Sequence, residues 1–467
     1  MGESVTIVGA GLSGSLLAIL LARRGHRVEV FERRGDPRVG AHDAGRSINL
    51  GLSARGIMAL RRAELWEEVR PLTVPMRGRL VHRRGRPPAF HPYGRDPSQI
   101  LYSIRRDALA TLLVSRAEKE QDVRFFFDTR CVAVDRERAA ITVEGQAGPR
   151  EVRADFVVGA DGAFSVVRAE THRGLPADFR QEFLDWGYKE LTIPPAPGGG
   201  PRVPIEALHV WPGSEGLVVG HPNLDDSLTC TLFMAHDRLT ALTGEDEAEA
   251  LFLEHFPGLL DLVPDLAGQV TAGPVGHLVT VRTSPWRHRD RVVLVGDACH
   301  AVYPFYGQGM NSSFEDCVVL DERMAAHPGD RAAAFAAYQE LRRPHTDVLA
   351  ELSAQNFLEL RDGLRSPLHL ARKKADHALH RLFPRAWVPL YTLVSHTTTP
   401  YGDALRRARV QDRVAGRRSW RAPRCWRRPP SVAYGGLAAT GEVLRDHPSP
   451  GRVDDPLRGG GPGPRRA

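Results

Sequence analysis

The sequence has few of the cysteines that cross-link small secreted proteins and lacks the long apolar segments that anchor membrane proteins. Its 467 residues include only five cysteines, at positions 131, 230, 299, 317 and 425, and none form a CxxC pair. No histidine spacing is typical of zinc ligands either, so we expect no metal and reduced, cytoplasmic thiols. The longest apolar stretch, Val5–Ala22, is interrupted by Gly9, Gly11, Ser13 and Gly14 and has no basic region before it. We therefore expect no membrane anchor, no signal peptide and a soluble protein.

Lysine is also scarce, and the excess positive charge is unevenly placed. The net charge is +7, but residues 403–467 hold 15 arginines against six acidic residues, which leaves the rest of the chain near neutral. Arginine, proline and glycine dominate residues 411–467, a composition that predicts a disordered basic tail. Trp420 and Trp426 lie among its arginines, where they could stack on bases. Because such patches bind nonspecifically, we expect no nucleic-acid partner.

The N-terminus predicts a compact βαβ unit, with strands at Ser4–Val8 and Arg27–Phe31 and a helix at Ser15–Arg24. Between the first strand and the helix lies a GxGxxG motif, formed by Gly9, Gly11 and Gly14. The first glycine allows a tight turn, the second lets the backbone approach a pyrophosphate, and the third lets helix and strand pack closely. The start of the helix then offers free N–H groups to that pyrophosphate.

An acidic residue completes the predicted dinucleotide site. Glu32 ends the second strand, 18 residues after Gly14, where a carboxylate accepts hydrogen bonds from a ribose. A carboxylate at this position disfavours a 2′-phosphate, so the motif predicts bound FAD or NAD.

Two further segments favour a flavin. Residues 157–168 place Asp161 and Gly162 after a strand, and residues 291–311 contain a buried strand that ends at Gly296 and Asp297. An acid at Asp297 can bind the ribityl hydroxyls of FAD. A Gly-rich turn follows, and the helix that opens at Gly309, Met310 and Asn311 can stabilise negative charge on reduced flavin.

Together these three segments resemble the single-component, aromatic-ring flavoprotein hydroxylases, over residues 4–410. The resemblance implies an α/β fold, in which a Rossmann-like FAD-binding domain is interleaved with a β-rich substrate domain and followed by C-terminal helices. It also implies that Arg106 lies near the cofactor phosphates. The expected FAD-binding parts are 1–75, 101–170 and 282–345, and the expected substrate parts are 76–100 and 171–281. A helical segment is expected at 346–410, after a break at Pro344 that separates helices at 331–343 and 349–364.

One branch of that group, the kynurenine 3-monooxygenases, matches more closely, above all in Tyr188–Pro194. The match implies a carboxylate clamp of Arg79 and Tyr93. It also implies polar groups at Asn356 and Tyr391, and ring walls at Phe305 and Tyr306. Its implied reaction is the hydroxylation of L-kynurenine at ring position 3 with NADPH or NADH and molecular oxygen, through a flavin C4a-hydroperoxide. No catalytic side chain is identified.

Some alternatives stay open at this point. The branch often has methionine where this chain has Leu360, so a substituted kynurenine or an anthraniloyl compound of secondary metabolism is an alternative substrate. A flavin-dependent halogenase is disfavoured because its WxWxIP stretch has no counterpart here. His300 is as compatible with a hydrogen-bonded histidine of the turn as with a base. The choice between NADPH and NADH, the pathway and the oligomeric state cannot be predicted.

Overall fold

The computed structural model describes residues 2–39, 48–94, 96–362, 375–376 and 378–415. Five parallel strands and one antiparallel edge strand, β18, form its six-stranded sheet, with the order β18-β19-β12-β1-β2-β8. The strands are β1 (Ser4–Val8), β2 (Arg27–Phe31), β8 (Val123–Phe126), β12 (Phe156–Gly159), β18 (Arg287–His288) and β19 (Val292–Leu294). β1 pairs in parallel with β2 and β12, and β12 pairs in parallel with β19. The carboxyl ends of β1, β12 and β19 therefore meet at one edge, where α/β sheets bind their ligands.

Helix α1 (Leu12–Arg23) packs on this sheet. Two further helices, α4 (Arg106–Ala117) and α11 (Gly309–Ala326), contact α1. The predicted βαβ unit is confirmed, with both strands at the predicted bounds. The helix begins at Leu12, three residues earlier than predicted, because the Gly11 carbonyl already accepts the first helical bond from Ser15 N at 3.0 Å. Contacts with both α4 and α11 explain why α1 is apolar on almost every side.

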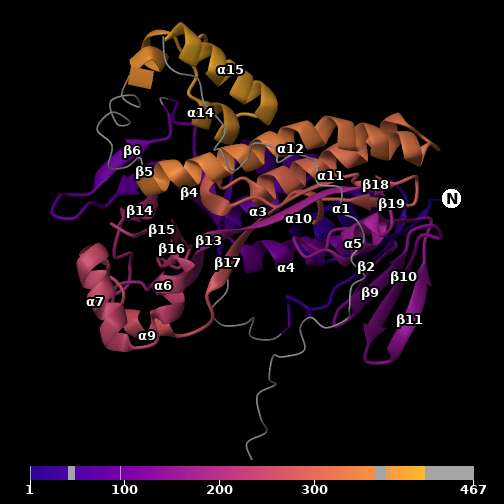
Figure 1. Cartoon of the computed structure of the whole chain (residues 1–467), viewed down its shortest axis with the longest axis horizontal. Coiled ribbons are helices and arrows are strands. Elements are labelled where there is room, and N and C mark those ends of the chain that lie inside the picture. Colours follow the sequence, from indigo (N-terminus) through magenta and orange to yellow (C-terminus); the bar gives the residue numbers. More distant parts are fainter. Residues whose placement is uncertain (1, 40–47, 95, 363–374, 377, 416–467) are drawn as a thin grey trace, which may run out of the picture. The chain divides into compact units, whose positions relative to one another are not determined.

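A seven-stranded sheet, with the order β17-β13-β16-β15-β14-β5-β6, joins two separate parts of the chain (Figure 1). Its strands are β5 (Gly78–Val81), β6 (Ala89–Pro92), β13 (Asp178–Ile193), β14 (Leu208–Pro212), β15 (Gly216–Pro222), β16 (Leu228–Ala235) and β17 (Gly276–Ser284). β14 pairs in parallel with β5, and Leu208 lies opposite Arg79. The helices that follow β16 are α6 (His236–Ala241), α7 (Glu245–His255), α8 (Pro257–Leu260) and α9 (Leu266–Thr271). Their apolar residues share a core with β13, β15 and β16. The limits of the two interleaved domains stay a prediction.

Smaller elements connect these sheets. One three-stranded sheet contains β3 (Asn49–Leu52), β4 (Thr73–Met76) and β7 (Leu101–Arg105), and another contains β9 (Arg130–Asp135), β10 (Ala140–Gly145) and β11 (Gly148–Arg153). The short helices are α2 (Ala54–Arg62), α3 (Trp66–Val69), α5 (Val166–His172) and α10 (Asp297–His300).

The predicted helix break at Pro344 is wrong. α12 runs continuously from Arg331 to Asp362 with Pro344 inside it, and it packs against α11 (Figure 1). A proline inside a helix removes one backbone hydrogen bond and costs about 3 kcal/mol. Leu349 and Leu352, beyond the proline, are buried in a core with α14 and α15, and this burial offsets the lost bond.

The C-terminal helices are α14 (Leu390–Ser395) and α15 (Tyr401–Val414). α15 continues four residues past the predicted start of the tail, because Gln411 and Asp412 are buried and Gln411 Nε2 donates to the Ala386 carbonyl at 3.2 Å. The rest of the predicted tail, residues 416–467, lies outside the described residues. Among the described residues, no helix is both long and apolar enough to cross a membrane.

Candidate functional site

The glycine turn at the end of β1 has two glycines that the fold requires and one that faces open space. Gly9 has a φ of +104°, and a Cβ on Gly14 would collide with the Gly9 carbonyl oxygen. A Cβ on Gly11, in contrast, would meet nothing within 4 Å. Packing therefore explains Gly9 and Gly14, whereas the lack of a side chain at Gly11 keeps the backbone open beside the first turn of α1. The N–H groups of that turn have no acceptor within the helix.

Glu32 lies beside this turn, as predicted. Its carboxylate accepts hydrogen bonds from Ala10 N at 2.9 Å and from Arg34 N at 3.0 Å. The two bonds fix the carboxylate between the end of β2 and the glycine turn. A carboxylate has further lone pairs, so it can still accept hydroxyl groups of a ribose.

The structure gives Asp161 a role within the fold. Its carboxylate accepts hydrogen bonds from the amides of Val166 (2.7 Å) and Val167 (3.1 Å), and also from the Ser165 hydroxyl, at the start of α5. Burial nevertheless raises the pKa of Asp161 above its usual range. Asp161 thus holds the turn after β12 in place, and its predicted contact with the cofactor stays a prediction.

Gly296 and Asp297 follow β19 at the same sheet edge. Gly296 has a φ of +61°, a left-handed conformation that glycine adopts without strain. Asp297 as a whole residue is exposed. Desolvation by the protein atoms around its carboxyl nevertheless raises the pKa of that group, and the nearby charges of His300 and Arg106 partly oppose the shift. Arg106, the exposed first residue of α4, is therefore close enough to Asp297 for its charge to act on that carboxyl.

The first turn of α11 contains Gly309, Met310 and Asn311. The Asn311 side chain is fully buried: its Oδ1 accepts from Ser53 N at 2.9 Å, and its Nδ2 donates to the carbonyls of Gly51 and Gly307 at 2.8 and 2.9 Å. The side chain thus ties α11 to the turn between β3 and α2. What remains for a ligand is the row of backbone N–H groups at the start of α11.

A second group of predicted residues forms an aromatic cluster around one cation. The Arg79 guanidinium carbon lies 4.4 Å from the ring centre of Tyr391 and 5.8 Å from that of Tyr93. The rings of Tyr93 and Tyr391 stack with centres 5.9 Å apart, and Tyr306 stacks on Tyr391 at 5.8 Å. We call these four residues the Arg79 cluster. They come from β5, the turn after β6, the turn before α11, and α14.

The Arg79 cluster has buried polar atoms whose hydrogen-bonding capacity is not fully used. Neither Arg79 Nε nor the Tyr93 hydroxyl makes a hydrogen bond of good geometry, although both atoms are buried. Among the described residues, no acidic side chain forms an ion pair with Arg79. Burial raises the pKa of the Tyr93 hydroxyl, so this group stays protonated and can donate. A buried, uncompensated cation is costly unless an anion joins it, so the cluster is suited to bind a carboxylate.

The two other predicted substrate residues lie together beside this cluster. Asn356 Nδ2 donates to the Phe305 carbonyl at 2.6 Å. The Phe305 ring lies 4.8 Å from that of Phe357 and 5.1 Å from that of Phe233. Asn356 therefore holds the backbone of the turn whose next residue, Tyr306, belongs to the Arg79 cluster.

Two neighbours of the cluster were missed in the sequence. His396 lies 5.3 Å from Tyr93 and 6.0 Å from Tyr391, measured between ring centres. The Tyr401 hydroxyl donates to Gln308 Oε1 at 3.1 Å, in the turn before α11. Neither residue belongs to a recognisable motif, and no sequence signal would have found them.

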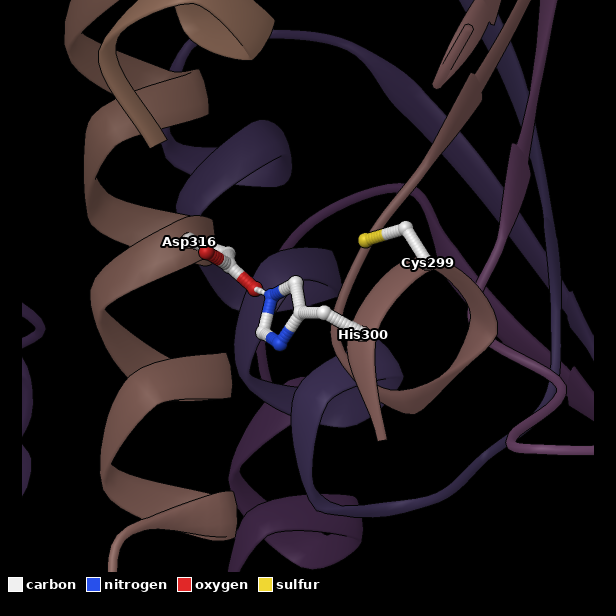
Figure 2. Close-up of side chains that lie close together, drawn as sticks. All are labelled: Cys299, His300 and Asp316. Atoms are coloured by element: carbon white, nitrogen blue, oxygen red, sulfur yellow. Dashed lines mark hydrogen bonds and ion pairs between the residues drawn. The ribbon is translucent and has the colours of Figure 1, made fainter. Parts of the chain in front are cut away.

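His300 takes part in a buried ionic network behind the turn. Figure 2 shows its imidazole pointing at Asp316 of α11, with which it forms a hydrogen bond. Arg342 Nε also donates to Asp316, at 2.7 Å. Burial alone would raise the pKa of Asp316, but His300 and Arg342 hold it below its usual range.

Cys299, His300 and Asp316 are close enough together to be considered as metal ligands. The Cys299 thiol, however, donates to the Gly296 carbonyl at 3.2 Å, and burial raises its pKa, so it is no thiolate. The Arg342 charge on Asp316 would also repel a cation. The arrangement is a hydrogen-bonded network, which favours the structural interpretation of His300 over that of a base.

A cavity of about 400 Å³ shares only Tyr93 with the Arg79 cluster. Its lining residues are His91, Pro92, Tyr93, Gly94, His380, Arg381, Pro389 and Thr392. It does not reach the glycine turn, so it is not the dinucleotide site.

Comparison with known proteins agrees with this geometry. Residues 3–353 match a family described as "FAD binding domain". One solved structure with a similar fold is the tetrameric form of 2-methyl-3-hydroxypyridine-5-carboxylic acid oxygenase, with a TM-score of 0.65 and 21% identity over 79% of this chain and 95% of that one. Another is Pseudomonas aeruginosa PqsL in complex with 2-aminobenzoylacetate, with a TM-score of 0.62 and 25% identity over 78% and 97%. The fold and the site thus define an FAD-dependent aromatic monooxygenase.

Two curated relatives belong to one particular enzyme family within this class. A kynurenine 3-monooxygenase of Salinispora arenicola is 56% identical over 421 residues, which are 89% of this chain and 92% of the relative. One of Stenotrophomonas maltophilia is 42% identical over 88% and 90%. The chain belongs to the kynurenine 3-monooxygenase family.

The residues at the sheet edge fit an FAD. Gly11 leaves the backbone open, and two helix starts point free N–H groups at that edge. Two carboxylates, Glu32 and Asp297, are available for hydroxyl groups, and Arg106 supplies a positive charge for phosphate. A dinucleotide with two sugar-like groups and a pyrophosphate matches this donor and acceptor set.

Proposed function

We propose that this chain hydroxylates L-kynurenine at ring position 3, with FAD as cofactor and NADPH, or NADH, and molecular oxygen as co-substrates. The observation that carries the proposal is the buried Arg79 guanidinium, surrounded by tyrosines and without an acidic partner among the described residues. Kynurenine combines a carboxylate with an aromatic ring, the two groups that such a cluster can bind.

The residues proposed to hold FAD are those of the sheet edge. They are Gly9, Gly11, Gly14, Glu32, Arg106, Asp161, Gly296, Asp297, Gly309, Met310 and Asn311. Bound FAD supplies the chemistry, which is reduction by NAD(P)H and activation of oxygen for transfer of one atom to the ring. The side chains of Asp161 and Asn311 form hydrogen bonds within the fold, so their proposed role is to position the turns around the cofactor.

The residues proposed to hold the substrate are Arg79, Tyr93, Asn356, Tyr391, Phe305 and Tyr306. Arg79 and Tyr93 bind the carboxylate with charge-assisted hydrogen bonds. Phe305 and Tyr306 wall the ring, and Asn356 keeps their turn in place through the Phe305 carbonyl. The protein thereby orients the ring carbon next to the aniline nitrogen and excludes water, and no side chain is needed as a nucleophile.

The interleaved domain limits and the cytoplasmic location belong to this proposal. Segments 76–100 and 171–281 contribute almost all of the seven-stranded sheet that contains Arg79, and β17 continues three residues past this limit, to Ser284. NAD(P)H is a cytoplasmic reductant, and the four cysteines among the described residues are free thiols.

The test is NADPH oxidation by the purified, FAD-loaded protein, with and without L-kynurenine. We expect kynurenine to stimulate the rate and to be consumed in proportion. If the protein is yellow but kynurenine does not stimulate NADPH oxidation, the assignment of an FAD-binding fold stands and kynurenine is not the substrate.

An anthraniloyl ketoacid is a second candidate substrate. The similarity to PqsL, solved with 2-aminobenzoylacetate, favours it, since that ligand also joins an ortho-amino ring to a carboxylate. Turnover of both compounds under the same conditions separates the two candidates.

A further inference from the structure

His396 adds a third buried polar atom without a partner to the surroundings of Arg79. It follows α14 directly, and its ring contacts both Tyr93 and Tyr391. Its Nε2 is buried and makes no hydrogen bond. Arg79 contacts the same two tyrosine rings. A cation and an unused imidazole nitrogen therefore share one small aromatic site.

The imidazole is neutral in this position. Burial and the charge of Arg79 lower the pKa of His396 to about 4, although the Ile100 backbone partly opposes the shift by hydrogen bonding to the ring. We place the ring proton on Nδ1, because Nε2 makes no hydrogen bond of good geometry. Nε2 then keeps its lone pair and is a hydrogen-bond acceptor.

One acid, Glu359, lies on the Tyr306 side of this cluster. Glu359, whose charge reaches Tyr306, accepts a hydrogen bond from Gln355 Nε2 at 3.0 Å. A ligand with an ammonium group next to its carboxylate would need an acceptor close to Arg79. His396 is an acceptor that touches the same rings as Arg79.

We propose that His396 Nε2 accepts a hydrogen bond from the α-ammonium group of the substrate, while Arg79 and Tyr93 hold its carboxylate. This inference rests on the proposed function and extends it: the site selects an α-amino acid over the corresponding acid without the amine. His396 is thus a specificity-determining, substrate-binding residue. It takes no part in the proton or electron transfers of the reaction.

The test compares two ligands on the FAD-loaded protein, without NADPH, by titration of the flavin absorbance. One ligand is L-kynurenine, and the other is 4-(2-aminophenyl)-4-oxobutanoate, which lacks only the α-amine. The unaltered chain should bind kynurenine at least about tenfold more tightly. His396→Phe should weaken kynurenine binding about 10- to 100-fold, as expected for one charge-assisted hydrogen bond, and leave the amine-free acid within about twofold. His396→Asn, which retains an acceptor, should lose less.

His82→Phe is the matched control. His82 is also a half-buried histidine with a pKa lowered to about 4, but its ring stacks on Trp211 and bonds to His209. It should leave the ratio of the two affinities unchanged. Equal weakening of both ligands by His396→Phe, or no weakening, would overturn the inference alone.

The unaltered chain provides an independent measurement if His396→Phe does not fold. Equal affinity for the two ligands in that chain would overturn the inference while kynurenine hydroxylation still stands. If the unaltered chain binds neither ligand, both the inference and the proposed function fail.

Discussion

At the scale of the residue, Arg79 is the group on which the proposed substrate site depends. Its guanidinium is buried among tyrosines, and without a bound anion it contributes an uncompensated charge to the interior. The same feature that binds a carboxylate should therefore lower the stability of the ligand-free protein.

Replacing Arg79 with methionine tests both consequences. We expect Arg79→Met to weaken kynurenine binding at least about 100-fold, since a buried charge pair is lost, while the ligand-free protein melts at the same or a higher temperature. Flavin titration and thermal unfolding measure the two effects. Arg77→Met is the control, because Arg77 is exposed and pairs with Glu206 at 2.9 Å. Unchanged kynurenine affinity in Arg79→Met would contradict the carboxylate site.

The glycine turn yields a second prediction at this scale. Gly11→Ala meets no protein atom, so it should change the stability of the FAD-free chain by less than about 1 kcal/mol and yet weaken FAD binding. Gly14→Ala should destabilise the chain itself by about 1–3 kcal/mol, because its Cβ collides with backbone. Urea unfolding of the FAD-free protein and FAD titration separate the two. FAD affinity that is unaltered in Gly11→Ala would rule out a pyrophosphate at this turn.

Motifs predict single residues well only where local backbone geometry determines their role. Gly9, Gly14 and Glu32 lie where the GxGxxG spacing places them. Asn311 was predicted as a cofactor residue through the start of its helix, which stays a prediction, whereas the bonds of its side chain to three backbone groups of the fold were not predicted. His396 was missed, because its contact with Tyr93 joins distant parts of the chain and follows from no local pattern.

At the scale of the element, α12 shows where a local rule fails. Proline predicts a helix break from the backbone alone, but Leu349 and Leu352 beyond Pro344 are buried against α14 and α15. Tertiary burial, which no local pattern contains, decides that the helix continues.

This interpretation predicts the effect of restoring the missing hydrogen bond. Pro344→Ala should raise the free energy of unfolding by about 1–3 kcal/mol, since alanine returns a backbone N–H and has the highest helix propensity. Urea unfolding measures the change, with Ala350→Gly, at a buried position further along the same helix, as a destabilising reference. A loss of stability in Pro344→Ala would mean that α12 needs the proline for its packing.

At the scale of the whole molecule, three histidines make stability depend on pH. His82, His221 and His396 each have a pKa lowered to about 4, mainly by burial. As the pH falls, these histidines are protonated near pH 6.5 in the unfolded chain but only near pH 4 in the folded chain. Their contribution to stability is thus complete above pH 6.5 and is lost as the pH falls towards 4.

The expected slope is about 1 kcal/mol per pH unit for each histidine within that window. Urea unfolding between pH 7 and 4 measures it. His82→Phe should reduce the slope, to which His26, His172, His209 and His345 also contribute because burial lowers the pKa of each. A slope in His82→Phe equal to that of the unaltered chain would show that His82 is not kept neutral by the fold. Asp316 acts in a separate window, because its lowered pKa affects stability only below about pH 4.

The whole molecule also shows why the site was only partly predictable. The order of β1, β12 and β19 along the chain, each followed by a turn motif, predicts one shared sheet edge. No such rule brings Arg79, Tyr93 and Tyr391 together, since they come from unrelated turns and strands. Their association was implied by resemblance to a family, and their contacts come from the tertiary fold.

The most direct test of the proposed function is to follow oxygen from ¹⁸O₂ into the product. The FAD-loaded protein is supplied with NADPH, L-kynurenine and ¹⁸O₂, and the product is analysed by mass spectrometry. We predict 3-hydroxykynurenine with one labelled oxygen, formed in proportion to the NADPH oxidised, with the second oxygen atom leaving as water. NADPH oxidation that yields only hydrogen peroxide, or a hydroxylated product without label, would contradict the proposed function.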